Sequence, residues 1–436
     1  MYFELKNIGA IKEAKIELGE LTVICGKNNT GKTYITYSIY GFLYKFHSLF
    51  IEEIECFKSL NFKNNTSIDL KALEYEFIKV NIQLNSIYTK QLKDIFNVNS
   101  EEFFNSQFNI HADFTKHPDN FTHIIEGNNT SIIRSDIIDN YLKIRVNNPN
   151  ESSKYLFKML FHRYYLKTIF SSPHPFIVSA ERTGIQLFQK ELDKHKNDLI
   201  KELTKTHDLD LLEENLARFA LPIENNINFT RDYYNLIKLN SFLKKEHPEL
   251  VNYIEEMLGI EYAIVNGNRV IIDKKTGKAL PYYMASASAL ALFDLHVWLK
   301  HKAQKGDILF IDEPELNLHP GNQIKIARLL VKLINVGIKV FITTHSDYII
   351  KELNNLLMLS NEFPEKTELM KEYDYQPNDI LQAKDLRAYI TNSNGTVSQV
   401  EIDEYGMIQS GFDDAIVQIN EASNKIISAV ENTLES

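Results

Sequence analysis

Cysteine is nearly absent from this chain: Cys25 and Cys56 are the two cysteines among 436 residues. Two cysteines do not make the disulfide framework of a small secreted domain, so we expect a reducing compartment. Long apolar runs are missing as well, because no stretch approaches the roughly 18 residues that a membrane-spanning helix needs. The first six residues also lack the pattern of a signal peptide. Together these absences predict a cytoplasmic protein with no membrane segment.

An excess of basic charge is missing too. The chain has 48 Lys and Arg against 58 Asp and Glu, which gives a formal net charge of −10. A surface that coats DNA uniformly is therefore not expected, although a net count does not exclude a local basic groove. Sustained heptads and internal repeats are absent, so we expect no long coiled coil. What remains is a globular composition, 44% hydrophobic and 24% charged, long enough for one large or two to three ordinary domains.

The most informative motif is a loop between an apolar strand and a helix. Residues 26–33 read Gly-Lys-Asn-Asn-Thr-Gly-Lys-Thr, follow the apolar run 21–25 and precede the helix-like run 34–40. This order of strand, loop and helix is the context that a nucleotide phosphate loop requires. Backbone N–H groups at such a helix start point at phosphates, Lys32 would reach the β- and γ-phosphates, and the Thr33 hydroxyl would hold Mg²⁺. The residues predicted to contact the nucleotide are Asn28, Asn29, Thr30, Gly31, Lys32, Thr33 and Tyr34.

Asn29 stands where related loops often carry glycine. Asparagine is one of the few side chains that tolerates a left-handed backbone, so this position remains compatible with a phosphate loop.

A second apolar strand, at 307–311, ends in two carboxylates. Asp312 is expected on the magnesium or in its outer shell, and Glu313 is placed to polarise the attacking water as a general base. The next strand, at 339–344, ends at His345, and the amphipathic run between the two strands supplies the crossover helix. Because the carboxyl ends of parallel strands meet at one edge of a sheet, these side chains are predicted to share a site.

The remaining sequence divides into segments of different pattern. Two alternating strands precede the phosphate-loop strand, as in an antiparallel sheet with one exposed face. Residues 43–170 have an irregular, mainly helical pattern and are predicted to be an insertion. Strand character returns at 174–182, and a helical lobe follows over about 186–260. Residues 351–436 are predicted to form a C-terminal α/β segment that ends in a helix at about 413–434.

Two motifs together resemble a known group of ATPases. Residues 313–320, Glu-Pro-Glu-Leu-Asn-Leu-His-Pro, and residues 343–346, Thr-Thr-His-Ser, resemble the ABC-type ATPases of the Rad50, SMC, RecF and OLD group, and the opening at 5–9 is similar to theirs. The resemblance implies an α/β fold: an ATPase head with a mixed central sheet and an antiparallel N-terminal sheet, built from residues 1–42 and 171–350. In those families two subunits enclose two ATP molecules, so ATP, Mg²⁺ and an ATP-dependent homodimer or higher oligomer are expected.

The same resemblance assigns roles position by position. Glu313 would be the catalytic carboxylate and His345 the switch histidine at the γ-phosphate. The signature segment that meets the partner's nucleotide would be residues 283–292, at the start of a helix. Ser286 or Ser288 would be its phosphate ligand, although the glycines of the family are absent there.

Two further residues follow the strand that ends near 179. The glutamine that links magnesium to the helical lobe would be Gln186 or Gln189, and Gln186 is preferred. For Arg182 two roles are open: a contact with phosphate, or an ion pair with a carboxylate.

Within this group the chain resembles compact OLD-like members that carry a helical insertion instead of long coils. Such members are often the ATPase subunits of bacterial anti-phage systems such as Gabija, Septu and PARIS. The resemblance implies a slow ATPase that acts as sensor and scaffold, with a phage protein or DNA as candidate trigger. The nearest approach to a nuclease motif, at 401–404, has the wrong carboxylate spacing, so a separately encoded nuclease or toxin is the expected effector. The alternative is a RecF-like ATPase of DNA repair, which would need a basic face. The ATPase subunit of a transporter is disfavoured by the degenerate signature and the insertion.

Overall fold

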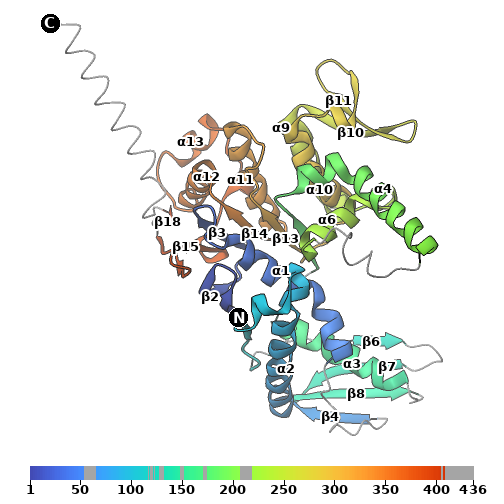
Figure 1. The fold of residues 1–436 in the computed structure, drawn as a ribbon. Helices are drawn as coiled ribbons and strands as arrows, with labels where there is room; N and C mark the ends of the chain where they lie inside the picture. The colour runs from blue at the N-terminus through green and yellow to red at the C-terminus, as the bar shows by residue number, and fades with distance from the viewer. Residues whose placement is uncertain are drawn as a thin grey trace, which may run out of the picture.

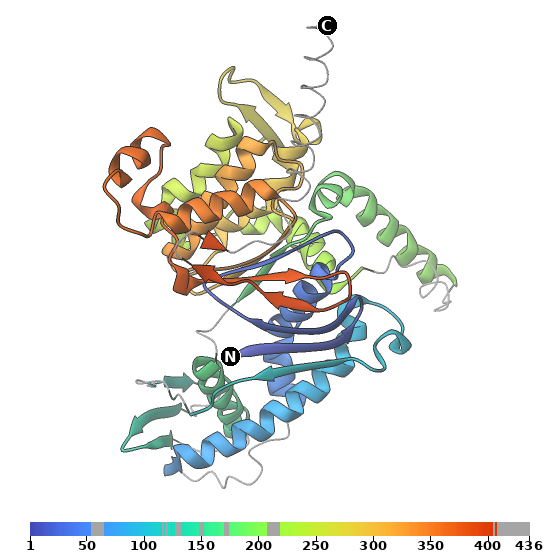
Figure 2. The ribbon, with the colours of Figure 1, turned by 90° about the vertical axis from the view of Figure 1, so that its left-hand side faces the viewer.

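The computed structural model describes residues 1–53, 65–115, 117, 121, 123–126, 132–147, 152–169, 174–206, 219–403, 406 and 407. Within this part of the chain a central sheet lies between two outlying parts (Figures 1 and 2). The insertion around residues 65–169 lies at one end in both views, and the lobe around residues 182–273 lies at the other. The described helices include none that is both long enough and apolar enough to cross a membrane.

The central sheet has six strands and carries the predicted motifs at one edge. In spatial order they are β16 (Val397–Gln399), β15 (Leu386–Thr391), β3 (Leu21–Gly26), β14 (Lys339–Thr344), β13 (Ile308–Asp312) and β9 (Pro175–Val178). Neighbouring strands from β15 to β9 are parallel, and β16 is antiparallel to β15. The predicted mixed sheet is thus confirmed. Since the parallel strands share a direction, the segments that follow β3, β9, β13 and β14 meet at one edge.

The strands form because both of their faces are buried, which explains their continuous apolar sequence. Successive residues of β13 alternate between two cores: Leu309 and Ile311 join one, and Ile308 and Phe310 join the other. The second core is covered by α1 (Lys32–Ser48) and the N-terminal sheet. The first is covered by helices α10 (Ala287–His301), α11 (Pro320–Asn335) and α12 (Asp347–Met358).

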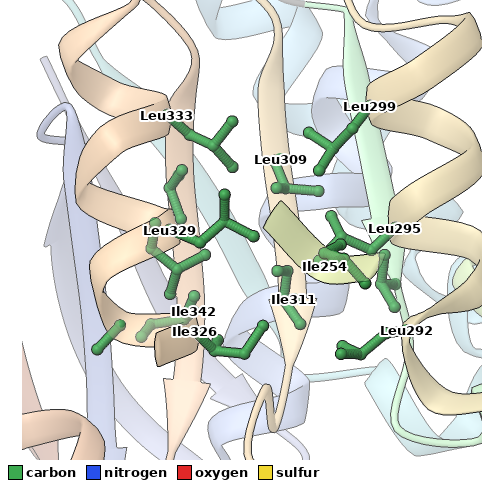
Figure 3. Packing of buried hydrophobic residues seen from close by; sticks show 14 of the residues in the cluster. Ile254, Leu292, Leu295, Leu299, Leu309, Ile311, Ile326, Leu329, Leu333 and Ile342 are labelled. Atoms are coloured by element: carbon green, nitrogen blue, oxygen red, sulfur yellow. The ribbon is translucent and has the colours of Figure 1, made fainter. Parts of the chain in front are cut away.

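Figure 3 shows the first of these cores from close by. Leu329 and Leu333 of α11 and Leu295 and Leu299 of α10 approach Leu309 of β13. Each of these side chains is at most 1% exposed. This dry packing anchors β13 between two helices and so fixes the position of the carboxylates at its end.

The N-terminal sheet has three strands in the order β2 (Ile11–Glu17), β1 (Tyr2–Ile8) and β5 (Gln107–His111), all antiparallel. The first two are the predicted alternating strands. The third comes from the insertion, and its pairing with β1 ties the insertion to the N-terminal sheet through backbone hydrogen bonds.

The insertion contains more strand than the predicted, mainly helical pattern implies. Its elements after α1 are the π-helix η1 (Leu49–Glu53), β4 (Asn65–Asp69), α2 (Leu70–Phe96), η2 (Ser100–Phe103), β6 (His123–Glu126), β7 (Ile132–Ile138), β8 (Tyr141–Asn147) and α3 (Ser152–Ile169). Strands β4, β8, β7 and β6 form an antiparallel sheet in that order. Helix α2 begins after Asp69, whose side chain caps it by accepting from the Lys71 N–H at 2.8 Å.

The helical lobe lies between β9 and β13 in the sequence. It consists of α4 (Arg182–Thr206), α6 (Leu221–Arg231), α7 (Tyr233–Leu236), α8 (Phe242–Glu246), α9 (Pro248–Leu258), a meander β10 (Ile260–Val265), β11 (Asn268–Asp273) and β12 (Ala279–Pro281), then η3 (Tyr282–Met284) and α10. The β10–β11 hairpin projects beyond α9 in Figure 1. Helix α10 is the last element of this lobe, and its side chains also join the first core against the central sheet.

The segment after residue 350 belongs partly to the central sheet. After α12 it contains α13 (Lys366–Glu372), η4 (Pro377–Asp379), η5 (Ala383–Asp385), β15, β16, β17 (Ile402–Asp403) and β18 (Gly406–Met407). Strand β15 pairs in parallel with β3, so the central sheet extends past residue 350, where the predicted ATPase domain ends. The predicted terminal helix at 413–434 lies outside the described residues.

Candidate nucleotide-binding site

The loop between β3 and α1 has the backbone of a phosphate cradle. Asn29 has a φ of 61° and Gly31 a φ of 97°, both in the left-handed region. The expectation that Asn29 tolerates this conformation is met. A Cβ on Gly31 would clash with the side chain of Ile11, so this position requires glycine for space as well as for conformation. The turn delivers successive N–H groups and the start of α1 to the same point.

Lys32 lies inside this loop and not on the surface. Its side chain is 6% exposed, and Nζ donates to the carbonyls of Gly26 at 2.8 Å and Lys27 at 3.0 Å. Thr30 Oγ1 donates to the Lys27 carbonyl at 2.7 Å and lies 2.5 Å from Thr391 Oγ1 on β15. The loop is therefore supported from β15, a contact that no local sequence signal indicated.

The predicted magnesium residues are brought together. Thr33 Oγ1 donates to Asp312 Oδ2 at 3.2 Å, and Thr343 Oγ1 donates to the other carboxylate oxygen. Burial, together with the nearby charges of Glu313 and Glu181, raises the pKa of Asp312 to about 6, against the two hydroxyl donors that lower it. A buried carboxylate held by hydroxyls, with further carboxylates near it, is an oxygen donor set that suits Mg²⁺ beside nucleotide phosphates.

Glu313 follows directly and has a strained backbone. Its φ is 52°, and its N–H donates to both the carbonyl and the Oγ1 of Thr343, each at 3.1 Å. The side chain is 26% exposed and lines the same cavity as the phosphate loop. A partly exposed carboxylate beside the phosphate cradle is suited to accept a proton from water.

His345 is held by a residue that the sequence analysis missed. Its Nδ1 lies 3.2 Å from Glu315 Oε1 and 3.6 Å from Glu313 Oε1. Glu315 is 6% exposed, and its Oε1 also accepts from the His345 N–H at 2.8 Å and from Thr344 Oγ1 at 3.0 Å. The buried Glu315 thus orients the histidine, and its place two residues after Glu313 was the available signal.

Arg182 forms hydrogen bonds with backbone carbonyls rather than an ion pair with a carboxylate of the described residues. Its guanidinium donates to the backbone carbonyls of Ser179, Asp312 and Glu313, at 3.0, 2.8 and 2.6 Å. It is 1% exposed, so it belongs to the support of the site rather than to its open surface.

Gln186 is buried in a hydrogen-bond network of the lobe. Its Nε2 donates to Asp294 Oδ1 at 2.8 Å and to Thr230 Oγ1 at 2.9 Å, and its Oε1 accepts from Tyr282 Oη at 2.9 Å. Arg269 bonds both Gln186 and the alternative, Gln189. Because both ends of the Gln186 amide are committed there, we withdraw the assignment of Gln186 as a magnesium ligand.

The two signature serines lie at the start of α10, as expected. Ser286 is the N-cap, and its Oγ accepts from the Ala289 N–H at 3.3 Å. Ser288 Oγ donates to the Asn317 carbonyl at 2.7 Å. Neither serine lines the cavity of its own chain's phosphate loop.

Two hollows meet at the start of α1. A cavity of about 520 Å³ is lined by Ala10, Asn28, Asn29, Thr30, Gly31, Lys32, Thr33, Tyr34 and Glu313. A second hollow of about 330 Å³ shares Thr33 and Tyr34 and continues along Gly9, Tyr37, Phe96, Val98, Glu102 and Phe103. The first is lined mostly by polar residues, including the cation Lys32, whereas half of the residues that line the second are aromatic and half come from the insertion.

The chain matches the family described as "AAA ATPase domain" over residues 1–350. That match spans more than half of the sequence, and the chain belongs to this family of ATPases. The prediction that this chain is a phosphate-loop ATPase is confirmed. Among curated proteins, none matches the sequence.

Solved structures similar to the chain include heads of SMC proteins. The SMC head domain from Thermotoga maritima is 11% identical with a TM-score of 0.32, over 92% of this chain and 98% of that one. An SMC head bound to the C-terminal winged-helix domain of ScpA is 11% identical, with the same coverage and a TM-score of 0.34. The Pyrococcus furiosus SMC head with an extended coiled coil, bound to the C-terminal domain of ScpA, is 12% identical over 97% of this chain and 98% of that one, with a TM-score of 0.31.

Proposed function

We propose that this chain binds ATP with Mg²⁺ in the 520 Å³ cavity and hydrolyses it slowly. One observation carries the proposal: side chains at the ends of three separate strands, β3, β13 and β14, line this cavity or contact a residue that lines it. They are the phosphate-loop Lys32 and Thr33, the carboxylates Asp312 and Glu313, and His345 beside Glu313. Each has the chemistry that phosphoryl transfer to water needs at that place.

The roles follow from the contacts. Lys32 and the loop N–H groups would bind the phosphates, because they form the positive base of the cavity. Thr33 and Asp312 would hold Mg²⁺, which when bound neutralises phosphate charge. Glu313 would orient water and accept its proton, and His345, held by Glu315, would contact the γ-phosphate.

The aromatic hollow would receive the base of the nucleotide. It shares Thr33 and Tyr34 with the phosphate cavity, and its walls include Tyr34, Tyr37, Phe96 and Phe103. The ring centroids of Tyr34 and Phe96 are 5.2 Å apart, and those of Phe96 and Phe103 are 5.1 Å apart. Aromatic faces suit a purine, so the insertion would contribute directly to ATP affinity.

The cellular role that we propose is control of a separately encoded nuclease or toxin in anti-phage defence, with ATP-dependent self-association as the switch. The resemblance of residues 313–320 and 343–346 to the OLD-like group supports this role. A phage protein or DNA would be the trigger.

The test of the ATPase assignment compares two variants. Lys32→Ala is expected to abolish ATP binding, whereas Glu313→Gln should keep binding and lower turnover by about a hundredfold or more, the scale of losing a transition-state group. Equilibrium dialysis measures binding and phosphate release measures turnover. Unchanged hydrolysis by the Glu313→Gln protein would remove Glu313 from the catalytic role.

The role in defence is tested separately. The purified chain, with ATP and Mg²⁺ or Mn²⁺, should leave plasmid, single-stranded DNA and tRNA intact, and should copurify with the product of a neighbouring nuclease or toxin gene. Cleavage that persists through purification and is lost in a point variant outside the ATP cavity would overturn the need for a separate effector.

A further inference from the structure

The backbone of Glu313 is in a conformation that needs external support. A non-glycine residue in the left-handed region is disfavoured by contact between its Cβ and the following carbonyl oxygen. Glu313 nevertheless has a φ of 52°, in the middle of the catalytic segment. Such strain persists where the surrounding structure holds it, and it gathers at functional sites.

Both polar backbone atoms of Glu313 are held. The N–H is bonded to Thr343 on β14, as described above. The carbonyl accepts from the Leu316 N–H at 3.0 Å and from Arg182 Nη2 at 2.6 Å. Arg182 Nη1 reaches the preceding carbonyl, that of Asp312, at 2.8 Å. One guanidinium therefore bridges the two peptide units that flank the turn at Glu313.

We infer that Arg182 is a positioning residue for ATP hydrolysis, which holds the left-handed backbone of Glu313 and so directs the Glu313 carboxylate into the cavity. This inference rests on the proposed catalytic role of Glu313. A planar guanidinium with several donors in a fixed fork can bond both carbonyls at once, and an ammonium group cannot reproduce that geometry.

The charge of Arg182 fits the same role. Its side chain is fully enclosed, and burial lowers its pKa, whereas the carboxylates of Asp312, Glu315, Glu313 and Glu181 oppose that shift. The bonds, however, go to backbone oxygens, which points to geometry as the main contribution of Arg182.

The position of Arg182 also links catalysis to the helical lobe. Arg182 is the first residue of α4, and the next residue, Thr183, accepts from Asn317 Nδ2 at 3.0 Å. Asn317 in turn accepts from Ser288 of the signature segment through its carbonyl. A shift of α4 relative to the sheet would therefore move the support of Glu313 and the signature segment together.

The decisive experiment is Arg182→Lys, which keeps a cation but cannot bond both carbonyls. The catalytic constant should fall by about tenfold to a hundredfold, the range typical of losing an orienting partner, while the dissociation constant of ATP stays within about twofold. Lys190→Met, an exposed cation on the same helix, is the matched control and should leave both constants unchanged. Thermal unfolding checks that the variants fold.

A double variant separates positioning from a merely structural effect. If Arg182 acts through Glu313, adding Arg182→Lys to Glu313→Gln should lower single-turnover hydrolysis by no more than about twofold, because coupled residues are not additive. Equal losses in both backgrounds would overturn the inference, as would loss of ATP binding in step with turnover. So would failure of both Arg182→Lys and Arg182→Gln to fold, since Arg182 would then support the sheet itself. Wild-type hydrolysis by Glu313→Gln alone would instead refute the proposed role of Glu313.

Discussion

The phosphate-loop half of the site and the signature half differ in how much one chain provides. Lys32 follows β3, and Asp312 and Glu313 lie at the end of β13, yet Lys32 and Glu313 line one cavity and Asp312 accepts from Thr33 beside them. Ser286 and Ser288 are instead used within their own chain, as a helix cap and as a donor to a loop carbonyl. The contrast teaches that one chain brings the phosphate-loop residues together by itself, whereas its two signature serines lie outside that cavity.

The largest effect is expected from a substitution in the signature segment that leaves the phosphate loop unchanged. Ser286→Asp retains a side-chain acceptor for the N-cap of α10, so the helix should remain intact. A negative charge facing the γ-phosphate of a partner would cost several kcal/mol, as like charges do across an interface. We expect ATP binding to persist and ATP-dependent association to fall by at least about tenfold.

Sedimentation in the Glu313→Gln background, with and without ATP, measures that association. Ser286→Asn is the matched control, because it caps the helix equally well and carries no charge. If the Asp and Asn proteins associate alike, or if the parent stays monomeric with ATP bound, the two-chain site is wrong.

The next effect concerns the support of His345 in the phosphate half. Glu315→Ala removes the acceptor of three contacts, including the His345 N–H at 2.8 Å, and leaves buried donors unpaired. We expect the catalytic constant to fall about tenfold, the lower end of the loss that follows when a partner orienting an active-site group is removed.

Glu315→Gln is the informative comparison for this position. Its amide oxygen can replace Oε1, so hydrolysis should stay within about threefold of the parent. Steady-state phosphate release at saturating ATP gives both values. Equal loss in the two variants would show that the charge of Glu315, rather than its hydrogen bonds, is what the site uses.

The difference between the two halves also explains what the sequence could reveal. Lys32, Thr33, Asp312 and Glu313 lie in short contiguous motifs directly after apolar strands, where parallel topology brings them together. The contact of Thr391 with Thr30 depends on β15 pairing with β3 across more than 360 residues, and no local pattern encodes that register. The strand β5 and the sheet of the insertion were missed for the same reason.

Gln186 is a residue whose predicted role the structure does not support. Its position after β9 favoured a magnesium role, but the choice between neighbouring helix faces is made by packing. Tyr282, Asp294 and Thr230 provide partners for every polar atom of the Gln186 amide within the lobe. A motif position alone does not determine which way such a side chain turns.

A smaller effect is expected at Phe96, and it distinguishes binding of the base from binding of the phosphates. Phe96→Ala removes an aromatic wall of the second hollow, and its ring lies 5.2 Å from that of Tyr34. The affinity for ATP should fall about threefold to tenfold, the scale of one aromatic contact of about 0.5–1.5 kcal/mol. Inorganic triphosphate is the matched ligand, and its affinity should not change because Phe96 does not line the phosphate cavity. Equal weakening of both ligands would place the base elsewhere.

The smallest effect lies in the lobe, at Asp294. Burial raises the pKa of this carboxyl to about 7, although Thr230, Arg269 and Gln186 oppose the shift. Between about pH 4 and pH 7 the folded chain then binds a proton that the unfolded chain has released, so the stability contributed by this group falls as the pH rises through that window. Asp294→Asn keeps an oxygen for the Gln186 N–H at 2.8 Å and has no charge to bury. Its unfolding temperature should exceed that of the parent by a few degrees at pH 8, with a smaller difference at pH 5. Calorimetry across this range measures the difference, and a gap that is constant or shrinks as the pH rises would show that Asp294 is ionised in the folded lobe at low pH.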